Sequence, residues 1–173
     1  MSIVVRPLDA EAYRAAIPAL ASLIQDAVEG GAGVNFLAGV THDEAAAWWT
    51  ERIPQVESGQ ITPFVAVEDV AIVGSVLLMR SRNPNSPHRA EIGKVLVLRS
   101  ARRQGVGAAL MAAAEARAIA DGRWLLILDT VSDSPADAFY RSLGWQAVGI
   151  IPNHAMTPDG VPAATTYFYK DLR

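Results

Sequence analysis

The fold is decided by one continuous stretch, Val95-Leu96-Val97-Leu98-Arg99-Ser100-Ala101-Arg102-Arg103-Gln104-Gly105-Val106-Gly107-Ala108-Ala109-Leu110. It begins as a buried strand, passes through a basic connector and enters a helical pattern. The first amides of a helix have no acceptor within the helix, and the helix dipole adds partial positive charge there. Gly105 and Gly107 would let an anion approach these amides, and Arg102 and Arg103 add charged donors. The stretch therefore predicts a site for a phosphate or pyrophosphate.

Outward from this stretch, the patterns predict an α+β domain with a mixed sheet. Strands are expected at 3–5, 64–67, 72–79, 91–98, 124–129, 145–151 and 165–170, and helices at 11–29, 41–56, 105–121 and 134–143. Thr41 and Glu44 form a capping-box pattern at the start of the second helix. Gly93 lies inside a strand and suggests a bulge or a close backbone approach. Residues 80–88 and 152–162 are rich in turn-forming residues and are expected to be loops.

Composition places the chain among ordinary globular proteins. Its 173 residues are 51% hydrophobic and 19% charged, which predicts one domain, 1–173, with a sizeable core. The absence of cysteine excludes disulfides and a thiolate metal site, and the scattered residues His42, His88 and His154 lack the spacing of metal ligands, so we expect no metal. No run of eighteen apolar residues exists and the first residues do not resemble a signal peptide, so we expect no membrane partner and a cytoplasmic location.

The charge of the chain is unevenly distributed. The total is −3, from 15 Lys and Arg against 18 Asp and Glu, which argues against a nucleic-acid partner. The segment from Arg80 to Arg103, however, contains seven basic residues and one acid, Glu91, a net charge of +6 that leaves −9 for the rest of the chain. Such a positive segment is either a solvated surface or the binding site of a compact anion.

Three interpretations of the connector compete. In the first, the glycines only allow the helix to pack closely on the sheet, because two glycines before a helix are a weak signal. The second is a nicotinamide-dependent enzyme, in which Asp129 at the end of the next strand would bind a ribose. Against it, Leu110 stands where the third glycine of the dinucleotide motif belongs, and the connector is long and basic. The third is a coenzyme A site.

A resemblance to a known family favours the third interpretation. Arg102-Arg103-Gln104-Gly105-Val106-Gly107 matches the (Gln/Arg)-x-x-Gly-x-(Gly/Ala) signature of the GNAT acyltransferase superfamily, after the fourth strand and before the third helix. Farther along, Asp133-x-x-Ala136-x-x-Phe139-Tyr140-x-x-x-Gly144-Trp145 is similar to the family's second segment, with Asp133 in place of Asn and Trp145 in place of Phe. The order of elements matches along nearly the whole chain.

Within the superfamily, the chain is most similar in pattern to the tabtoxin-resistance acetyltransferase branch. The strings that carry this likeness are His88-Arg89-Ala90-Glu91, Leu128-Asp129-Thr130, Ala138-Phe139-Tyr140 and Pro158-Asp159-Gly160. The likeness implies that the acceptor is a small amino-acid-like antimetabolite, which the enzyme would detoxify.

The resemblance also implies a GNAT fold, a mixed and mostly antiparallel sheet of about seven strands with about four helices, whose central parallel pair splays apart. Those two strands would end at Leu98 and Asp129. Acetyl-CoA would lie between them, with its pantetheine arm on the backbone of residues 94–98 and its pyrophosphate on the amides of residues 104–108. The implied cofactor-binding residues are Val95, Val97, Leu98, Arg102, Arg103, Gln104, Gly105, Val106, Gly107, Ala108, Asp133, Ala136 and Phe139. The +6 segment would then serve the phosphates of the cofactor.

The catalytic residues are implied in the same way. Tyr140 matches the family tyrosine that faces the cofactor sulfur, and a phenol with a pKa of about 10 can give a proton to a leaving thiolate. Its alternative role is packing the helix on the sheet. Glu91 and Asp129 are candidates for the base or for anchoring the acceptor, against surface or capping roles. Residues 35–37 and 152–162 are expected to border the acceptor pocket.

The sequence therefore predicts an acetyltransferase that moves an acetyl group from acetyl-CoA to an amine or hydroxyl of a small molecule by direct transfer, acting as a monomer or homodimer. The net charge of −9 on the rest of the chain favours a cationic acceptor. Two alternatives share the cofactor site: a protein or peptide N-acetyltransferase, and a non-catalytic acyl-CoA-binding sensor.

Overall fold

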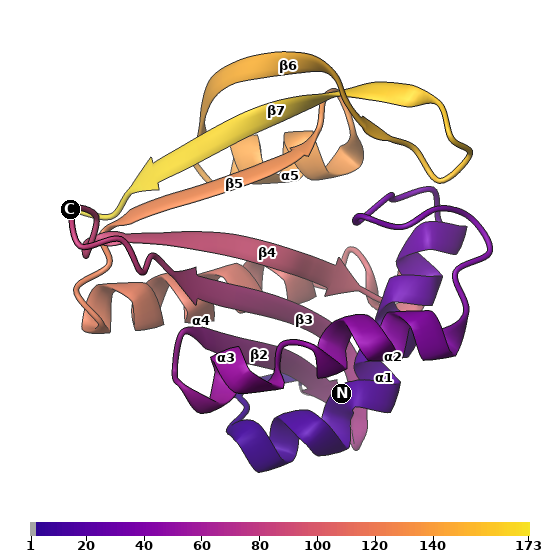
Figure 1. Ribbon diagram of the computed structural model, residues 1–173, viewed down its shortest axis with the longest axis horizontal. Helices are drawn as coiled ribbons and strands as arrows, with labels where there is room; N and C mark the ends of the chain where they lie inside the picture. The colour runs from indigo at the N-terminus through magenta and orange to yellow at the C-terminus, as the bar shows by residue number, and fades with distance from the viewer. Residues whose placement is uncertain (1–2) are drawn as a thin grey trace.

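One seven-stranded sheet forms the frame of the protein in the computed structural model, which describes residues 3–173 (Figure 1). The strands are β1 (Ile3–Pro7), β2 (Ile61–Glu68), β3 (Ala71–Arg80), β4 (Arg89–Val97), β5 (Leu125–Val131), β6 (Gln146–Met156) and β7 (Pro162–Asp171). Their order in the sheet is β1-β2-β3-β4-β5-β7-β6. Only β4 and β5 run parallel; the other five pairs are antiparallel. The predicted α+β class and mixed sheet are confirmed.

Helices cover both faces of the sheet. They are α1 (Ala10–Glu29), α2 (His42–Thr50), α3 (Ile53–Glu57), the 3-10 turn η1 (Arg99–Ala101), α4 (Val106–Ala120) and α5 (Pro135–Ser142). Because neighbouring strand residues point to opposite faces, Leu77 of β3 joins the core beneath α1 and α2, whereas Leu78 joins the core beneath α4 and α5. Both faces of the central strands are therefore buried. In the described residues, no helix is long and apolar enough to cross a membrane.

Two predicted boundaries are wrong for identifiable reasons. The helix expected at 41–56 is divided into α2 and α3, with Pro54 in the first turn of α3. A proline inside one continuous helix would lack an amide and clash with the preceding turn, so the chain ends α2 and starts again. The loop expected at 152–162 is mostly strand, because β6 continues to Met156 through an irregularity between Ile151 and Ala155 and pairs again with β7.

Candidate functional site

The central parallel pair is joined at one end only. The register of β4 and β5 ends with Glu91 opposite Ile127, although β4 continues to Val97 and β5 to Val131. Figure 1 shows the two strands close together at the left of the view and diverging toward the right. A strand that leaves its neighbour presents a row of backbone N–H and C=O groups to the gap. The predicted splay is confirmed, and it begins just after Glu91.

A bulge in β4 lies next to this divergence. Lys94 has a φ of 49°, in the left-handed region, and the β3–β4 register shifts opposite it between Ser75 and Leu77. The Ser75 hydroxyl donates a hydrogen bond to the Lys94 carbonyl over 3.0 Å. Gly93 makes room for the bend, since a Cβ there would lie 2.6 Å from Cε of Met79. The bulge thus changes the direction of β4 at the start of the gap.

The connector follows β4 and ends in an open helix terminus. Gly105, the N-cap of α4, has a φ of 80°, which favours glycine, and it offers no side chain to cap the helix. The first amides of α4 are therefore available to an anion. The exposed Arg102 and Arg103 lie beside them, and Arg102 Nε donates to the Val97 carbonyl over 3.1 Å. Side chain and backbone donors thus gather between the end of β4 and the start of α4.

Gly107 serves packing more directly than anion binding. A Cβ at this position would lie 3.1 Å from Cζ of Phe139, so the missing side chain allows α5 to approach α4. Val106 is 2% exposed and belongs to the core, which leaves only its backbone amide for a ligand. The role of the Gly107 backbone in anion binding stays a prediction, and the contact with Phe139 is an additional reason for glycine here.

The other predicted cofactor residues lie around the same gap. Val95, Val97, Leu98, Ala136 and Phe139 are partly buried and pack against the core beneath α4 and α5. Gln104 donates to the Ser100 carbonyl, and Ala108 lies in the first turn of α4. Asp133 is exposed, with a φ of 57° just before α5. The binding of coenzyme A by these residues stays a prediction.

Two carboxylates stand on the α1 side of the sheet where the strands separate. Glu91 lies between Ala90 and Ile92, which both point to the α4 side, so its own side chain points the other way. Asp129 follows Ile127, the partner of Glu91, by two residues and therefore shares that face. Partial burial, together with the negative charge of Asp129, raises the pKa of Glu91. Neither carboxylate forms an ion pair within residues 3–173.

Tyr140 approaches from the opposite face. It lies on α5, is 7% exposed, and contacts the rings of Phe139, Trp145 and Phe168. Burial and the charge of Asp129 raise its pKa, so the phenol is protonated at neutral pH. Within residues 3–173 its hydroxyl makes no hydrogen bond, yet it is not one of the buried polar atoms without a partner, so the oxygen is accessible. Tyr140 packs the helix on the sheet and also retains a free proton donor.

Two segments that are distant in the sequence contact each other beside the sheet. The segment between α1 and α2 meets the turn between β6 and β7, where the Ala38 amide donates to the Pro158 carbonyl over 2.9 Å. Lys94 ties the same segment to β4, since Nζ donates to the Val34 carbonyl over 2.7 Å. The two segments that were expected to border an acceptor pocket, 35–37 and 152–162, therefore belong to parts of the chain that contact each other.

Sequence reasoning missed a polar pair on β6 and β7. Tyr167 lies opposite Asp129 in the β5–β7 register, and its hydroxyl is 3.2 Å from Nε2 of His154. Nδ1 of His154 is 3.1 Å from the hydroxyl of Thr165. The irregularity in β6, with Asn153 at a φ of 53°, folds His154 back over β7. Because the sequence suggested a loop here, nothing in it indicated these contacts.

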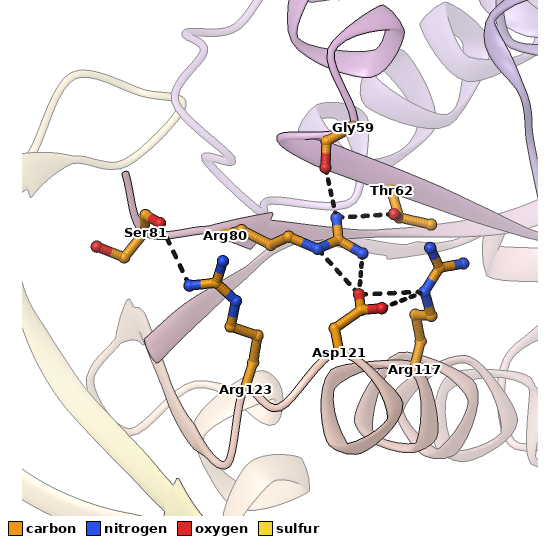
Figure 2. A network of polar contacts seen from close by, with 7 residues as sticks. All are labelled: Gly59, Thr62, Arg80, Ser81, Arg117, Asp121 and Arg123. Atoms are coloured by element: carbon orange, nitrogen blue, oxygen red, sulfur yellow. Dashed lines mark hydrogen bonds and ion pairs between the residues drawn. The ribbon is translucent and has the colours of Figure 1, made fainter. Parts of the chain in front are cut away.

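The basic segment 80–103 is divided among several places, which corrects its assignment to one ligand. Arg80 binds Asp121 at the end of α4, and Arg117 binds the same carboxylate over 3.0 Å (Figure 2). Arg99 pairs with Asp26 at 2.9 Å and Glu29 at 2.8 Å. Only Arg102 and Arg103 remain at the open end of α4.

No three His, Asp or Glu side chains are grouped so that they could hold a metal ion in the part of the chain that the structure describes, residues 3–173.

Comparisons with known proteins agree with this geometry. The model of the acetyltransferase (GNAT) family matches residues 21–145, more than half of the chain. An N-acetyltransferase from Staphylococcus aureus Mu50 has a similar structure, with a TM-score of 0.80 and 19% identity over 100% of both chains. The structure of yncA from Salmonella typhimurium with its cofactor acetyl-CoA has a TM-score of 0.78 and 19% identity, over 100% of this chain and 95% of that chain. A ribosomal-protein-alanine N-acetyltransferase from Brucella melitensis has a TM-score of 0.74 and 23% identity, over 98% of this chain and 99% of that chain. At these identities the likeness is one of fold, and the tabtoxin-resistance branch stays a prediction.

Proposed function

We propose, from the premise that this chain belongs to the acetyltransferase (GNAT) family, that it transfers an acetyl group from acetyl-CoA directly to an amine of a small molecule. One observation carries the proposal. The carboxylates of Glu91 and Asp129 and the phenol of Tyr140 approach the divergence of β4 and β5 from opposite faces of the sheet. A thioester held between the strands would have an acceptor for protons on one side and a donor on the other.

The gap and the connector fit a coenzyme A molecule. The backbone of β4 after Glu91 faces the gap without a strand partner, as an extended pantetheine arm requires. The open amides of α4, with Arg102 and Arg103 beside them, suit a pyrophosphate. Acetyl-CoA, when bound there, supplies an activated thioester whose acetyl carbon can form a bond to nitrogen as its bond to sulfur breaks.

The residues of the chain would move the protons of this exchange. The raised pKa of Glu91 makes it the better base, so we assign to it the proton that the amine nitrogen loses, taken directly or through a water molecule. Tyr140 gives its phenolic proton to the sulfur that leaves. Proton transfer through solvent from Glu91 to Tyr140 then restores both groups. Asp129 is assigned to orient the amine and to keep the pKa of Glu91 raised.

The segments between α1 and α2 and between β6 and β7 favour a small acceptor over a peptide. The hydrogen bond from the Ala38 amide to the Pro158 carbonyl joins the two segments that we expect to border the acceptor pocket, which would leave less room for a peptide. The Brucella melitensis structure bears the name of an enzyme that acts on a ribosomal protein, so a peptide acceptor is the second candidate for this fold. A hydroxyl acceptor would use the same residues, with the oxygen losing its proton to Glu91.

A thiol-release assay with acetyl-CoA and a panel of amines tests the proposal. We expect turnover with at least one small amine, and we expect Tyr140→Phe to lower kcat by about 100-fold while the Kd of coenzyme A stays within about twofold. Tyr169→Phe, which removes a phenol that donates to Gln146 of the edge strand β6, is the matched control and should keep its activity. Coenzyme A binding with no thiol release from any amine or peptide would identify a sensor and refute the proposed activity.

A further inference from the structure

A pair of positive side chains shares one indole ring on the carboxylate side of the sheet. The guanidinium carbon of Arg52 lies 3.2 Å from the ring centroid of Trp48, and Nζ of Lys94 lies 4.3 Å from the same ring. Lys94 donates to the Val34 carbonyl, and Arg52 donates to the Trp48 carbonyl. Three separate parts of the chain therefore bring these two cations together: the loop before α2, the segment from α2 to Arg52 at the N-cap of α3, and the bulge in β4.

Within residues 3–173, no buried carboxylate forms an ion pair with either cation of this pair. The one acid within ion-pair distance of Arg52 in residues 3–173 is Glu51, at 3.8 Å, and its side chain is 75% exposed. Lys94 forms no ion pair within the same residues. Burial and the charge of Arg52 lower the pKa of Lys94 to about 8, although Asp129 works in the opposite direction. Two partly buried cations without a carboxylate between them are costly unless an anion joins them.

The pair lies on the same side of the sheet as the proposed base. Lys94 follows Glu91 by three residues on β4, and its neighbour Leu96 points into the core beneath α1 and α2. The carboxylate of Asp129 acts on the pKa of both Glu91 and Lys94. This side of the sheet thus has negative groups at the start of the gap and positive groups next to the loop between α1 and α2.

We propose that Lys94 and Arg52 form an anion subsite of the acceptor pocket, and that the acceptor carries a carboxylate in addition to its amine. This inference rests on the proposed acetyl transfer. The amine would lie at Glu91 and Asp129, and the two oxygens of the carboxylate would each meet one cation. Trp48 and Phe36, whose rings are 6.4 Å apart, form apolar walls that favour a compact ligand. The acceptor is then dipolar and is not simply cationic.

Matched acceptors test the subsite. Each of a panel of L-amino acids is compared with its carboxamide in the thiol-release assay, and binding of the same pairs in the presence of coenzyme A is measured by calorimetry. We expect at least one amino acid to exceed its carboxamide by about 10- to 100-fold in kcat/KM and in affinity, as charged hydrogen bonds require. Lys94→Gln and Arg52→Gln should each reduce this ratio to within about threefold of one, whereas Lys94→Arg should restore most of it.

Arg82→Gln provides the matched control, because it removes a cation of the basic segment that is exposed and bonds only Gln60 among residues 3–173. Its preference for the carboxylate should equal that of the wild type. Equal use of amino acids and carboxamides by the wild type would overturn the subsite and leave the acetyl transfer intact. Binding of a carboxylate that depends on Lys94, without any thiol release, would support the subsite and refute the proposed function.

Discussion

Two clusters in this protein each bring two cations together, and they differ in what lies between them. Arg80 and Arg117 share the carboxylate of Asp121, and Arg80 also donates to Gly59 and Thr62 (Figure 2). Lys94 and Arg52 share the ring of Trp48. An indole face attracts a cation but carries no net charge. The first cluster is therefore complete within the protein, whereas in residues 3–173 the second has as its ion-pair partner only the exposed Glu51, 3.8 Å from Arg52.

The difference distinguishes cations that stabilise the fold through an ion pair from cations that we propose bind a ligand. The pair around Asp121 joins the end of β3 to the C-terminal end of α4, opposite the end at which the connector enters this helix. The connector resembles the second cluster, since Arg102 and Arg103 lie beside open amides without a carboxylate. The sign of the net charge of a segment is thus less informative than the partner of each side chain.

The largest effect is expected where an acid is added to an open positive site. Gly105→Asp places a carboxylate at the N-terminus of α4, where we propose that the pyrophosphate binds, and should weaken coenzyme A binding by at least about 100-fold. Gly105→Asn is the matched control, because asparagine has the same shape, is neutral and tolerates a φ of 80°. Titration calorimetry gives both Kd values. If Asp and Asn weaken coenzyme A binding equally, the backbone conformation at Gly105, and not the added negative charge, accounts for the loss.

The converse change removes the acid from the complete cluster. Asp121→Asn leaves Arg80 and Arg117 facing each other with side chains 12% and 44% exposed, and should lower the free energy of unfolding by about 2 kcal/mol. Urea denaturation measures this loss. Glu57→Gln breaks the pair with Arg14, whose members are 46% and 48% exposed, and serves as a control with a much smaller loss. A loss no larger than that of the control would remove the distinction between the clusters.

A change of opposite sign is expected at Lys94. Lys94→Met removes a partly buried charge and should raise the free energy of unfolding at pH 7 by about 1 kcal/mol, even as it impairs acceptor binding. The pKa of Lys94 is lowered to about 8 in the folded protein. The charged lysine therefore lowers the free energy of unfolding of the wild type below pH 8, and this destabilisation disappears as the pH rises from 8 toward the ordinary lysine pKa. The gain should therefore shrink above pH 8. A loss of stability at pH 7 would mean that the bond to Val34 outweighs the burial.

The smallest effect concerns the pH dependence of anion binding. Lys94 faces Arg52, which lowers its pKa, and Asp129, which raises it, and it must be protonated to hold a carboxylate. An N-acetylated amino acid, the product of the proposed reaction, has no amine that titrates. Its affinity should fall by about three- to tenfold from pH 7 to pH 9 as Lys94 loses its proton. Calorimetry with Lys94→Gln should give a flat profile; a wild-type profile that is equally flat would exclude Lys94 as the anion ligand.

The parts of the site that sequence reasoning predicted depend on short segments. The connector, the cap of α4 by Gly105 and the position of Tyr140 on α5 each follow from residues within one or two turns of one another. Caps, glycines and apolar periodicity are local signals, and they predicted the strands that became β4 and β5. The divergence of these strands was expected from the family resemblance, and their register confirms it.

The parts that were missed depend on distant segments. Gly93 indicated the bulge, and the register of β3 and β4 confirms it. Nothing near Lys94, however, indicates that its side chain lies against Trp48 and Arg52, more than forty residues earlier in the chain. His154 could be placed on Tyr167 only by knowing that β6 continues through its irregularity. The break at Pro54 was readable, because a proline marks a helix start as well as a helix end.

A crystal structure with acetyl-CoA tests the central claim most directly. We expect the pantetheine arm between β4 and β5, bonded to the backbone of residues 92–97, with the pyrophosphate on the amides at the start of α4 and the thioester between Glu91 and the hydroxyl of Tyr140. Cofactor bound elsewhere, or a thioester beyond reach of both Glu91 and Tyr140, would contradict the claim.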